Sequence, residues 1–242
     1  MDADFFVRDI SECKIGLKAL KCDWHDVVID YTHRRLSFPD DKLTAMAALA
    51  SKFRQLGAGE YLAGLWSSSL ITDLMWMVPP AERAIVPRSR PVHYRAPSWS
   101  WAAIDGSVAF THYVLEKATY EANVIRCETV PRSIEVPTGN VVSGILEIQG
   151  RVKPAFHNLG SHDVFDMEDD GREHPMFKAY MDTKSDEDEY LYCLKLDREG
   201  SDLLLRNTSD HYSRVGFFER SFCSDKGMGW FDDASPTIIL IR

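Results

Sequence analysis

The spacing of apolar residues changes near residue 94, and this change constrains the possible folds more than any other feature of the chain. Before it, apolar residues recur every three or four positions, which is the period of a helix that buries one face. After it, short segments rich in β-branched and aromatic residues alternate with Gly, Pro, Asn and Asp, a pattern typical of strands and turns. We therefore predict an α+β fold in which an N-terminal helical cap packs on an antiparallel β-barrel or β-sandwich.

The helical cap is assigned to residues 1–80. Aspartates that can cap helices, and glycines and prolines that end them, divide this part into segments. Helices are expected at about 23–31, 40–53, 61–66 and 70–77.

The antiparallel β-domain is assigned to residues 92–242. Its expected strands are the tryptophan-rich segment near residue 99 and seven others, at 108–115, 120–128, 144–152, 189–196, 201–206, 212–218 and 237–241. Because the connection over 78–91 is short, we expect the helices and the sheet to share one core.

The tryptophan-rich segment reads Tyr-Arg-Ala-Pro-Ser-Trp-Ser-Trp-Ala-Ala-Ile-Asp-Gly over 94–106. In a strand, side chains alternate between the two faces. Trp99 and Trp101 would then share one face, with Ser98 and Ser100 on the other. We expect the two indoles to be buried side by side.

Three segments of the chain together resemble a known family. Residues 40–46 (Asp-Asp-Lys-Leu-Thr-Ala-Met), 61–66 (Tyr-Leu-Ala-Gly-Leu-Trp) and 94–106 resemble, in this order and at similar spacing, the region that follows the HET domain in fungal heterokaryon-incompatibility proteins. Residues 202–205 and 212–217 resemble the two strands that close that region. The resemblance covers about 20–242, and it implies that Trp66, Trp99 and Trp101 belong to a common scaffold.

The HET domain itself, which is similar to TIR domains, has no counterpart in the resemblance. Because the matching part begins at about residue 20, we expect this chain to lack that domain. Its NAD-cleaving and TIR-like assembly functions are therefore not expected here.

Charge and cysteine content bear on location and partners. Of the net charge of −9, −8 lies between His162 and Tyr190, where eleven acidic residues meet three basic ones, so we expect a solvated loop there. No basic stripe favours nucleic acid. The number of cysteines is odd and no C-x-x-C pair is present, and the sequence has no signal peptide, so we expect a cytoplasmic protein. It also has no apolar run long enough to span a membrane.

Signatures of nucleotide, metal and nucleophile chemistry are missing from the sequence. The acidic run that begins at Asp166 imitates a calcium loop, but Phe177 stands where a bidentate Glu is required. His157, His162 and His174 have spacings that match no usual metal-ligand pattern. We expect no cofactor and no metal.

Aromatic residues and hydrogen-bond donors are the remaining candidates for a ligand site. The side chains expected to line an apolar cavity between helices and sheet are those of Trp66, Trp76, Trp99, Trp101 and Tyr113. The candidate donors, which would polarise a carbonyl, are His33, Tyr61, Tyr94 and Arg95.

Each candidate also has a structural alternative. The tryptophans can simply fill the core. A histidine such as His33 is favoured at a helix end by the helix dipole. Arg95 can form a salt bridge that holds the entry to the tryptophan segment, and Asp105 can be a turn residue.

Two classes of function remain open. The first is a cofactor-independent cyclase or pericyclase of the Diels-Alderase type, which folds a polyunsaturated terpenoid or polyketide of fungal secondary metabolism in an aromatic pocket. The second is a non-enzymatic recognition or regulatory module related to heterokaryon incompatibility, with the acidic stretch 162–190 as contact surface. An enclosed cavity of roughly 300 Å³ or more lined by Trp and Tyr favours the enzyme, and a filled core favours the module.

Overall fold

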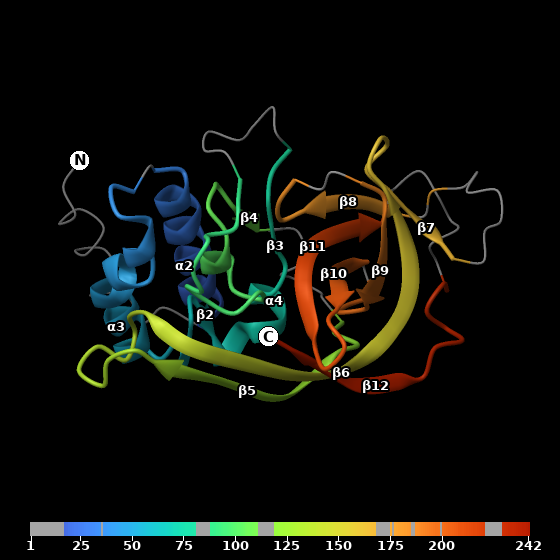
Figure 1. Cartoon of the computed structure of the whole chain (residues 1–242). Helices are drawn as coiled ribbons and strands as arrows, with labels where there is room; N and C mark the ends of the chain where they lie inside the picture. Colours follow the sequence, from blue (N-terminus) through green and yellow to red (C-terminus); the bar gives the residue numbers. More distant parts are fainter. Residues whose placement is uncertain are drawn as a thin grey trace.

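The computed structural model (Figure 1) describes residues 17–34, 36–80, 88–110, 119–167, 175, 177–184, 187–198, 200–220 and 229–242. Strands account for 40% and helices for 20% of the structure, which is therefore a mixed α/β fold dominated by strands. The longer helices come first in the chain, and the long strands follow residue 120. This order agrees with the change of apolar spacing near residue 94.

The first expected helix is confirmed and is longer than expected. Helix α2 (Leu17–Thr32) buries Leu20, Trp24 and Val28, which lie four residues apart on one face. In the described part of the chain, no helix has the length and apolar character needed to cross a membrane.

The second expected helix starts later than predicted. Two short 3₁₀ turns, η1 (Pro39–Asp41) and η2 (Thr44–Met46), precede helix α3 (Ala47–Gln55). The Lys42 carbonyl accepts a hydrogen bond from the Tyr31 hydroxyl at 2.9 Å, and the Met46 amide bonds to Leu43 rather than to Lys42. This local i,i+3 bonding explains why the α-helix begins only at Ala47.

The prediction of a short helix at 61–66 is wrong, because this segment forms a β-hairpin. Strands β1 (Tyr61–Leu62) and β2 (Leu65–Trp66) pair around Ala63 and Gly64, whose φ angles are 48° and 100°. Two successive positive φ angles are the mark of a tight two-residue hairpin turn. A Cβ on Gly64 would lie 2.6 Å from Trp101 Nε1, so the close approach of this indole also requires glycine.

The helix expected at 70–77 is confirmed only in its first half. After the 3₁₀ turn η3 (Ser67–Ser69), helix α4 (Leu70–Asp73) ends and strand β3 (Trp76–Met77) follows. Strand β3 pairs with β4 (Ala109–Phe110), which is the described part of the strand expected at 108–115. Residues 111–118 lie outside the described part.

The tryptophan segment is buried as expected, but it is not a strand. Residues 98–100 form a turn, and η5 (Trp101–Ala103) is a 3₁₀ helix. The Ser100 hydroxyl explains the difference, because it accepts from the Ala102 amide at 3.0 Å and donates to the Ala63 carbonyl at 2.5 Å. These bonds stabilise a turn rather than an extended strand.

Eight strands form the main sheet, and six of them were expected at nearly these positions. Their bounds are β5 (Asn123–Pro131), β6 (Val141–Asn158), β7 (Asp163–Asp166), β8 (Phe177–Met181), β9 (Glu189–Leu194), β10 (Ser201–Asn207), β11 (Tyr212–Arg220) and β12 (Pro236–Ile241). Pairing runs in a closed circuit through β6, β9, β10, β11, β8 and β7. Strand β5 extends from β6 outside this circuit, and β12 pairs antiparallel with β6 but parallel with β11. The sheet is therefore not a clean antiparallel barrel (Figure 1).

The solvated loop expected over 162–190 is wrong in part. Strands β7 and β8 lie within this stretch, and Phe177, Ala179 and Met181 are buried, whereas Lys178 points to solvent. The high acidic content obscured this two-residue alternation in the sequence. Residues 168–174, 176 and 185–186 lie outside the described part.

Two apolar clusters occupy opposite faces of the sheet. Leu203 and Leu205 of β10 belong to the larger cluster, and Leu204 between them belongs to the smaller one. The larger cluster also contains buried residues of α2 and α3 and the buried hydrophobic residues of the tryptophan segment. Residues from both parts assigned in the sequence, 1–80 and 92–242, thus contact one another in this cluster.

Candidate functional site

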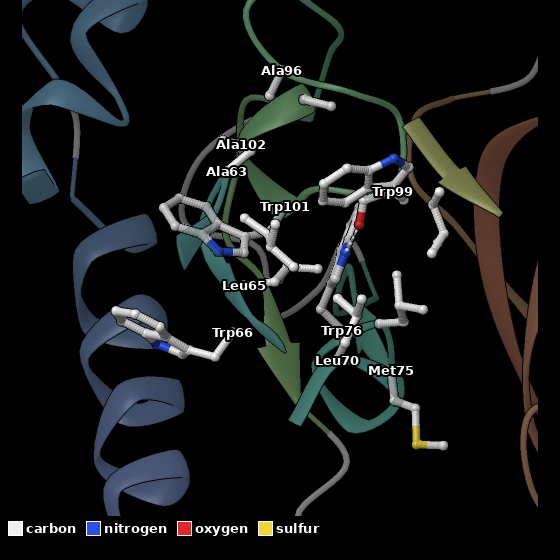
Figure 2. Packing of buried hydrophobic residues seen from close by; sticks show 14 of the residues in the cluster. Ala63, Leu65, Trp66, Leu70, Met75, Trp76, Ala96, Trp99, Trp101 and Ala102 are labelled. Atoms are coloured by element: carbon white, nitrogen blue, oxygen red, sulfur yellow. Dashed lines mark hydrogen bonds between the residues drawn. The ribbon is translucent and has the colours of Figure 1, made fainter. Parts of the chain in front are cut away.

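The four tryptophans expected to line a cavity are packed inside the larger cluster. Their side chains are at most 1% exposed, and Figure 2 shows Leu65, Leu70 and Met75 among them. Trp76 Nε1 donates to the Trp99 carbonyl at 2.9 Å, and Trp101 Nε1 donates to the Gly64 carbonyl at 2.8 Å. Trp66 packs edge-on against Trp24 at 5.3 Å between ring centroids. The fifth candidate, Tyr113, lies outside the described residues.

Arg95 has the structural contacts that the sequence left as its alternative role. This buried side chain donates to the Ala102 carbonyl at 2.7 Å and to the Pro39 carbonyl at 3.0 Å. Its guanidinium also lies 2.8 Å from the Asp105 carboxylate. Arg95 therefore ties η1 to the tryptophan segment, and its donors are directed at protein groups.

His33 and Tyr94 lie apart from the indoles. Half-buried His33 contacts the Ile29 carbonyl through Nδ1 at 2.7 Å, at the C-terminal end of α2, where the helix dipole favours a histidine. Tyr94 is 50% exposed, and burial of the rest of its side chain raises the pKa of the phenol to about 12. The structure does not bring these two donors to one cavity with the tryptophans.

Tyr61 is the candidate donor whose hydroxyl lacks a partner. The side chain is buried between Trp24 and Trp66, and Oη forms no hydrogen bond with any described residue. Burial raises the pKa of this phenol, so the hydroxyl stays protonated. An unpaired buried hydroxyl destabilises the fold by roughly 1–3 kcal/mol.

Replacing Tyr61 by Phe is therefore expected to leave the free energy of unfolding unchanged or to raise it by about 1 kcal/mol. Urea denaturation measures this difference. Tyr31→Phe is the matched control, since it removes the 2.9 Å bond to the Lys42 carbonyl and should lower stability by about 1 kcal/mol. A loss above 1 kcal/mol in Tyr61→Phe would show that its hydroxyl has a partner.

An open hollow of about 240 Å³ lies where α2, η1 and the end of the tryptophan segment meet. Its described lining consists of Tyr31, Thr32, Arg34, Leu36, Pro39, Lys42, Asp105 and Gly106. We call this the lysine hollow. It combines one buried amine, one half-buried carboxylate and an apolar wall, which is a small set of polar groups of the kind found in ligand sites.

Lys42 is the most unusual residue of the lysine hollow. The side chain is 3% exposed, Nζ donates to the Ile104 carbonyl at 2.6 Å, and it lies 5.3 Å from the centre of the Trp101 ring. Burial, together with the positive charge of Arg95, lowers the pKa of the amine to about 7, although Asp105 opposes this shift. Both protonation states of Lys42 are thus populated near neutral pH.

Sequence reasoning did not select Lys42. The aspartate-lysine-leucine segment was used only for the family resemblance, and Asp105 was interpreted as a turn residue. The sequence held no usable signal for it, because the burial of Lys42 and the contact of Pro39 with Arg95 appear only in the folded chain. Lysines are rarely buried, so a buried lysine marks a candidate site once the structure has shown its burial.

A second hollow, of about 270 Å³, lies between β1 and β5. The described residues that line it include Glu60, Tyr61, Cys127, Glu128 and Thr138. Burial raises the pKa of the Cys127 thiol to about 12, so it is a poor nucleophile at neutral pH. Neither hollow has a tryptophan among its described lining residues.

Two buried pairs of polar side chains were also missed by the sequence analysis. His25 Nε2 lies 2.9 Å from the Asp73 carboxylate, whose other oxygen accepts from the Trp66 amide at 2.8 Å. Arg214 and Asp182, 0% and 1% exposed, pair at 3.2 Å. Both pairs join segments far apart in the sequence, so their role is structural.

The described histidines do not form a metal site. Within the described ranges, no group of three or more His, Cys, Asp or Glu side chains could hold a metal ion. His157 is fully buried, 6.4 Å from the ring of His162, and burial lowers its pKa. His174, the third histidine considered, lies outside the described residues.

None of the family models, curated proteins or solved structures compared with the chain matches it. The resemblance to the region that follows the HET domain therefore stays an interpretation of sequence segments. The structure does bring these segments into contact: Arg95 bonds to Pro39 next to the first, Lys42 bonds to Ile104, and Trp101 bonds to Gly64. We call these contacting segments the motif unit, and the lysine hollow lies at its surface.

Proposed function

We propose that the chain is a non-enzymatic recognition or regulatory module, related to heterokaryon-incompatibility proteins, that binds a ligand in the lysine hollow. The observation that carries this proposal is the position of Lys42, a buried amine at the wall of an open hollow. Burying a lysine costs free energy unless it is compensated. The hydrogen bond to the Ile104 carbonyl compensates part of this cost, and a polar ligand group in the hollow would compensate more.

The packing of the indoles supports the module over the cyclase. A cyclase of the expected type needs a dry cavity that shapes its substrate against aromatic side chains. Trp66, Trp76, Trp99 and Trp101 contact protein groups on all sides and are at most 1% exposed. The tryptophan segment thus acts as the framework that holds Lys42 and Asp105 at the hollow.

The charges around the lysine hollow favour a ligand with a carboxylate or carbonyl oxygen. Lys42 and Arg34 line it, and Arg95 lies behind it, against one lining carboxylate, Asp105. Arg34 is itself paired with Asp30 at 2.6 Å on the surface, so this arginine is largely neutralised. Lys42 is then the main attractive group for a ligand oxygen.

The cyclase hypothesis keeps one supporting observation. Tyr61 Oη and Trp99 Nε1 are buried donors without a partner among the described residues, and an unpaired donor is what a carbonyl substrate would use. If this hypothesis holds, Tyr61→Phe lowers the rate of product formation roughly 10- to 1000-fold. The stability measurement described above is independent of that outcome.

Several finer expectations drawn from the sequence remain proposals. They are the description of the fold as a helical cap on a barrel or sandwich, the cytoplasmic location, an apolar small-molecule substrate, and the absence of nucleic-acid binding. Because β11 pairs parallel with β12, the description as an antiparallel barrel can apply only to the circuit of six strands.

A fragment titration followed by amide NMR tests the proposed function. Small carboxylates and aldehydes are expected to shift the amide signals of Thr32, Leu36 and Gly106, which line the hollow, and to leave the indole N–H signals of Trp76 and Trp99 in place. Leu36→Trp, which fills the hollow, should abolish these shifts, and Leu56→Trp, outside the hollow, should not. Fragments that shift the two indole signals instead would contradict the module.

A further inference from the structure

The surroundings of Lys42 are those of a reactive amine. Among the described residues, its Nζ has one hydrogen-bond partner, the Ile104 carbonyl at 2.6 Å. A neutral amine that donates one hydrogen to this carbonyl keeps its lone pair for another direction. The Trp101 ring lies 5.3 Å from Nζ, Arg95 and Asp105 act on the amine through their charges, and Lys42 is one of the residues that line the open hollow.

We propose that Lys42 captures a small aldehyde or ketone in the lysine hollow as a Schiff base, a step that rests on the proposed function because the same hollow must admit the ligand. The amine lone pair attacks the carbonyl carbon, and a C–N bond forms as the carbonyl oxygen takes up a proton. Loss of this oxygen as water then leaves the C=N bond. The step is reversible and needs no oxidant or reductant.

The charged groups around Lys42 match this chemistry. Arg95 faces it from the tryptophan segment and disfavours the ammonium form, while Asp105 favours that form and lines the same hollow. Asp105 is 33% exposed, so its carboxylate can exchange the protons of the addition and dehydration steps with solvent. Tyr31, Thr32 and Arg34 are the other polar residues of the described lining, and the Tyr31 phenol, with its pKa raised to about 12 by burial, stays neutral.

The size of the hollow limits the carbonyl compound. About 240 Å³ admits a molecule of a few heavy atoms beside the lysine side chain, and it excludes a polycyclic terpenoid. The protonated form of Lys42, which coexists with the neutral form near pH 7, adds a preference for a second, anionic group on the ligand. Glyoxylate, a two-carbon aldehyde with a carboxylate, has both features and serves as the probe.

Trapping with borohydride tests the inference on the wild-type protein. Glyoxylate is added at pH 7, borohydride supplies the hydride that reduces the C=N bond to a stable amine, and peptide mass spectrometry locates the carboxymethylated lysines. Lys42 is expected to be modified at least about tenfold faster than the exposed Lys184, because an ordinary lysine, with a pKa near 10.4, is almost wholly protonated at pH 7. Equal or slower modification of Lys42 would overturn the inference.

The pH profile and two variants separate a reactive amine from a merely accessible one. Modification of Lys42 should level off above pH about 8, whereas that of Lys184 should keep rising toward pH 10. Lys42→Met should remove the fast adduct, and Lys184→Met should leave it. The profile uses the wild-type protein and so remains decisive if Lys42→Met does not fold.

The outcomes also distinguish this inference from the proposed function. Noncovalent fragments that occupy the hollow without any fast adduct at Lys42 would leave the recognition module standing and refute the reactive lysine. A fast adduct at Lys42 in a protein that binds no fragment noncovalently would support the reactive lysine and contradict the recognition module.

Discussion

Replacing Arg214 by Ala is expected to lower the free energy of unfolding by about 3–5 kcal/mol, the usual cost of removing one partner from a buried ion pair. The guanidinium bonds to the Asp182 carboxylate at 3.2 Å, to the Leu74 carbonyl at 2.6 Å and to the Trp76 carbonyl. Its carbon lies 3.3 Å from the centre of the Trp76 ring. Removing the arginine therefore leaves the two carbonyls without their donor, and it leaves the buried Asp182 carboxylate with the more distant Arg90, at 3.6 Å.

Urea denaturation with a matched control measures this effect. Arg206→Ala removes an exposed ion pair with Glu189 and should cost no more than about 1 kcal/mol. Arg214 joins strand β11 of the sheet to α4 and β3 of the helical part, so the transition of the variant should also lose cooperativity. A cost below 1 kcal/mol for Arg214→Ala would mean that the two parts do not depend on this pair.

Replacing Trp101 by Ala is the second change with a large expected effect, a loss of about 3–5 kcal/mol from the cavity and the lost apolar burial. The indole is fully buried, donates to the turn of the β1–β2 hairpin and lies under the Lys42 amine. Thermal or urea unfolding measures the loss. Tyr190→Ala, at a tyrosine that is 66% exposed, is the aromatic control and should cost under about 1 kcal/mol.

The Trp101 result bears on function as well as stability. A scaffold role predicts a stability loss together with loss of fragment binding in the lysine hollow, because Lys42, which lines the hollow, loses the ring that it packs on. A small stability loss with a new ligand bound in place of the indole would instead favour an aromatic pocket.

The sequence predicted the helices and strands that have a clear period. Helix α2 and strands β6, β9, β10, β11 and β12 follow directly from the spacing of their apolar residues. The hairpin at 61–66 was missed because its short apolar run fits a helix equally well. Its turn depends on positive φ angles at Ala63 and Gly64 and on the contact of Gly64 with Trp101, 37 residues away in sequence.

The tryptophan segment illustrates a different limit. Burial of Trp99 and Trp101 was foreseen from residue type, but alternation suggested a strand where a Ser100-capped 3₁₀ turn exists. Strand β8 was missed in the sequence, because the acidic residues around it concealed the alternation of its three buried residues. Local sequence patterns do not predict the backbone conformation where side-chain hydrogen bonds or residues distant in the sequence determine it.

The candidate site was the least predictable part. Arg95 was selected as a donor from its position beside the tryptophan segment, and it proved to hold that segment in place. Lys42 and Asp105 come to one hollow only through the contacts of Pro39, Ile104 and Arg95 across the fold. No spacing along the chain reveals this arrangement.

A crystal structure of the protein soaked with glyoxylate tests the central claim most directly, namely that the buried indoles are framework and that the lysine hollow is the binding site. The account predicts density for the ligand against Lys42 and Asp105, with the side chains of Trp66, Trp76 and Trp99 unmoved. Ligand density among those three indoles, with the hollow empty, would contradict it.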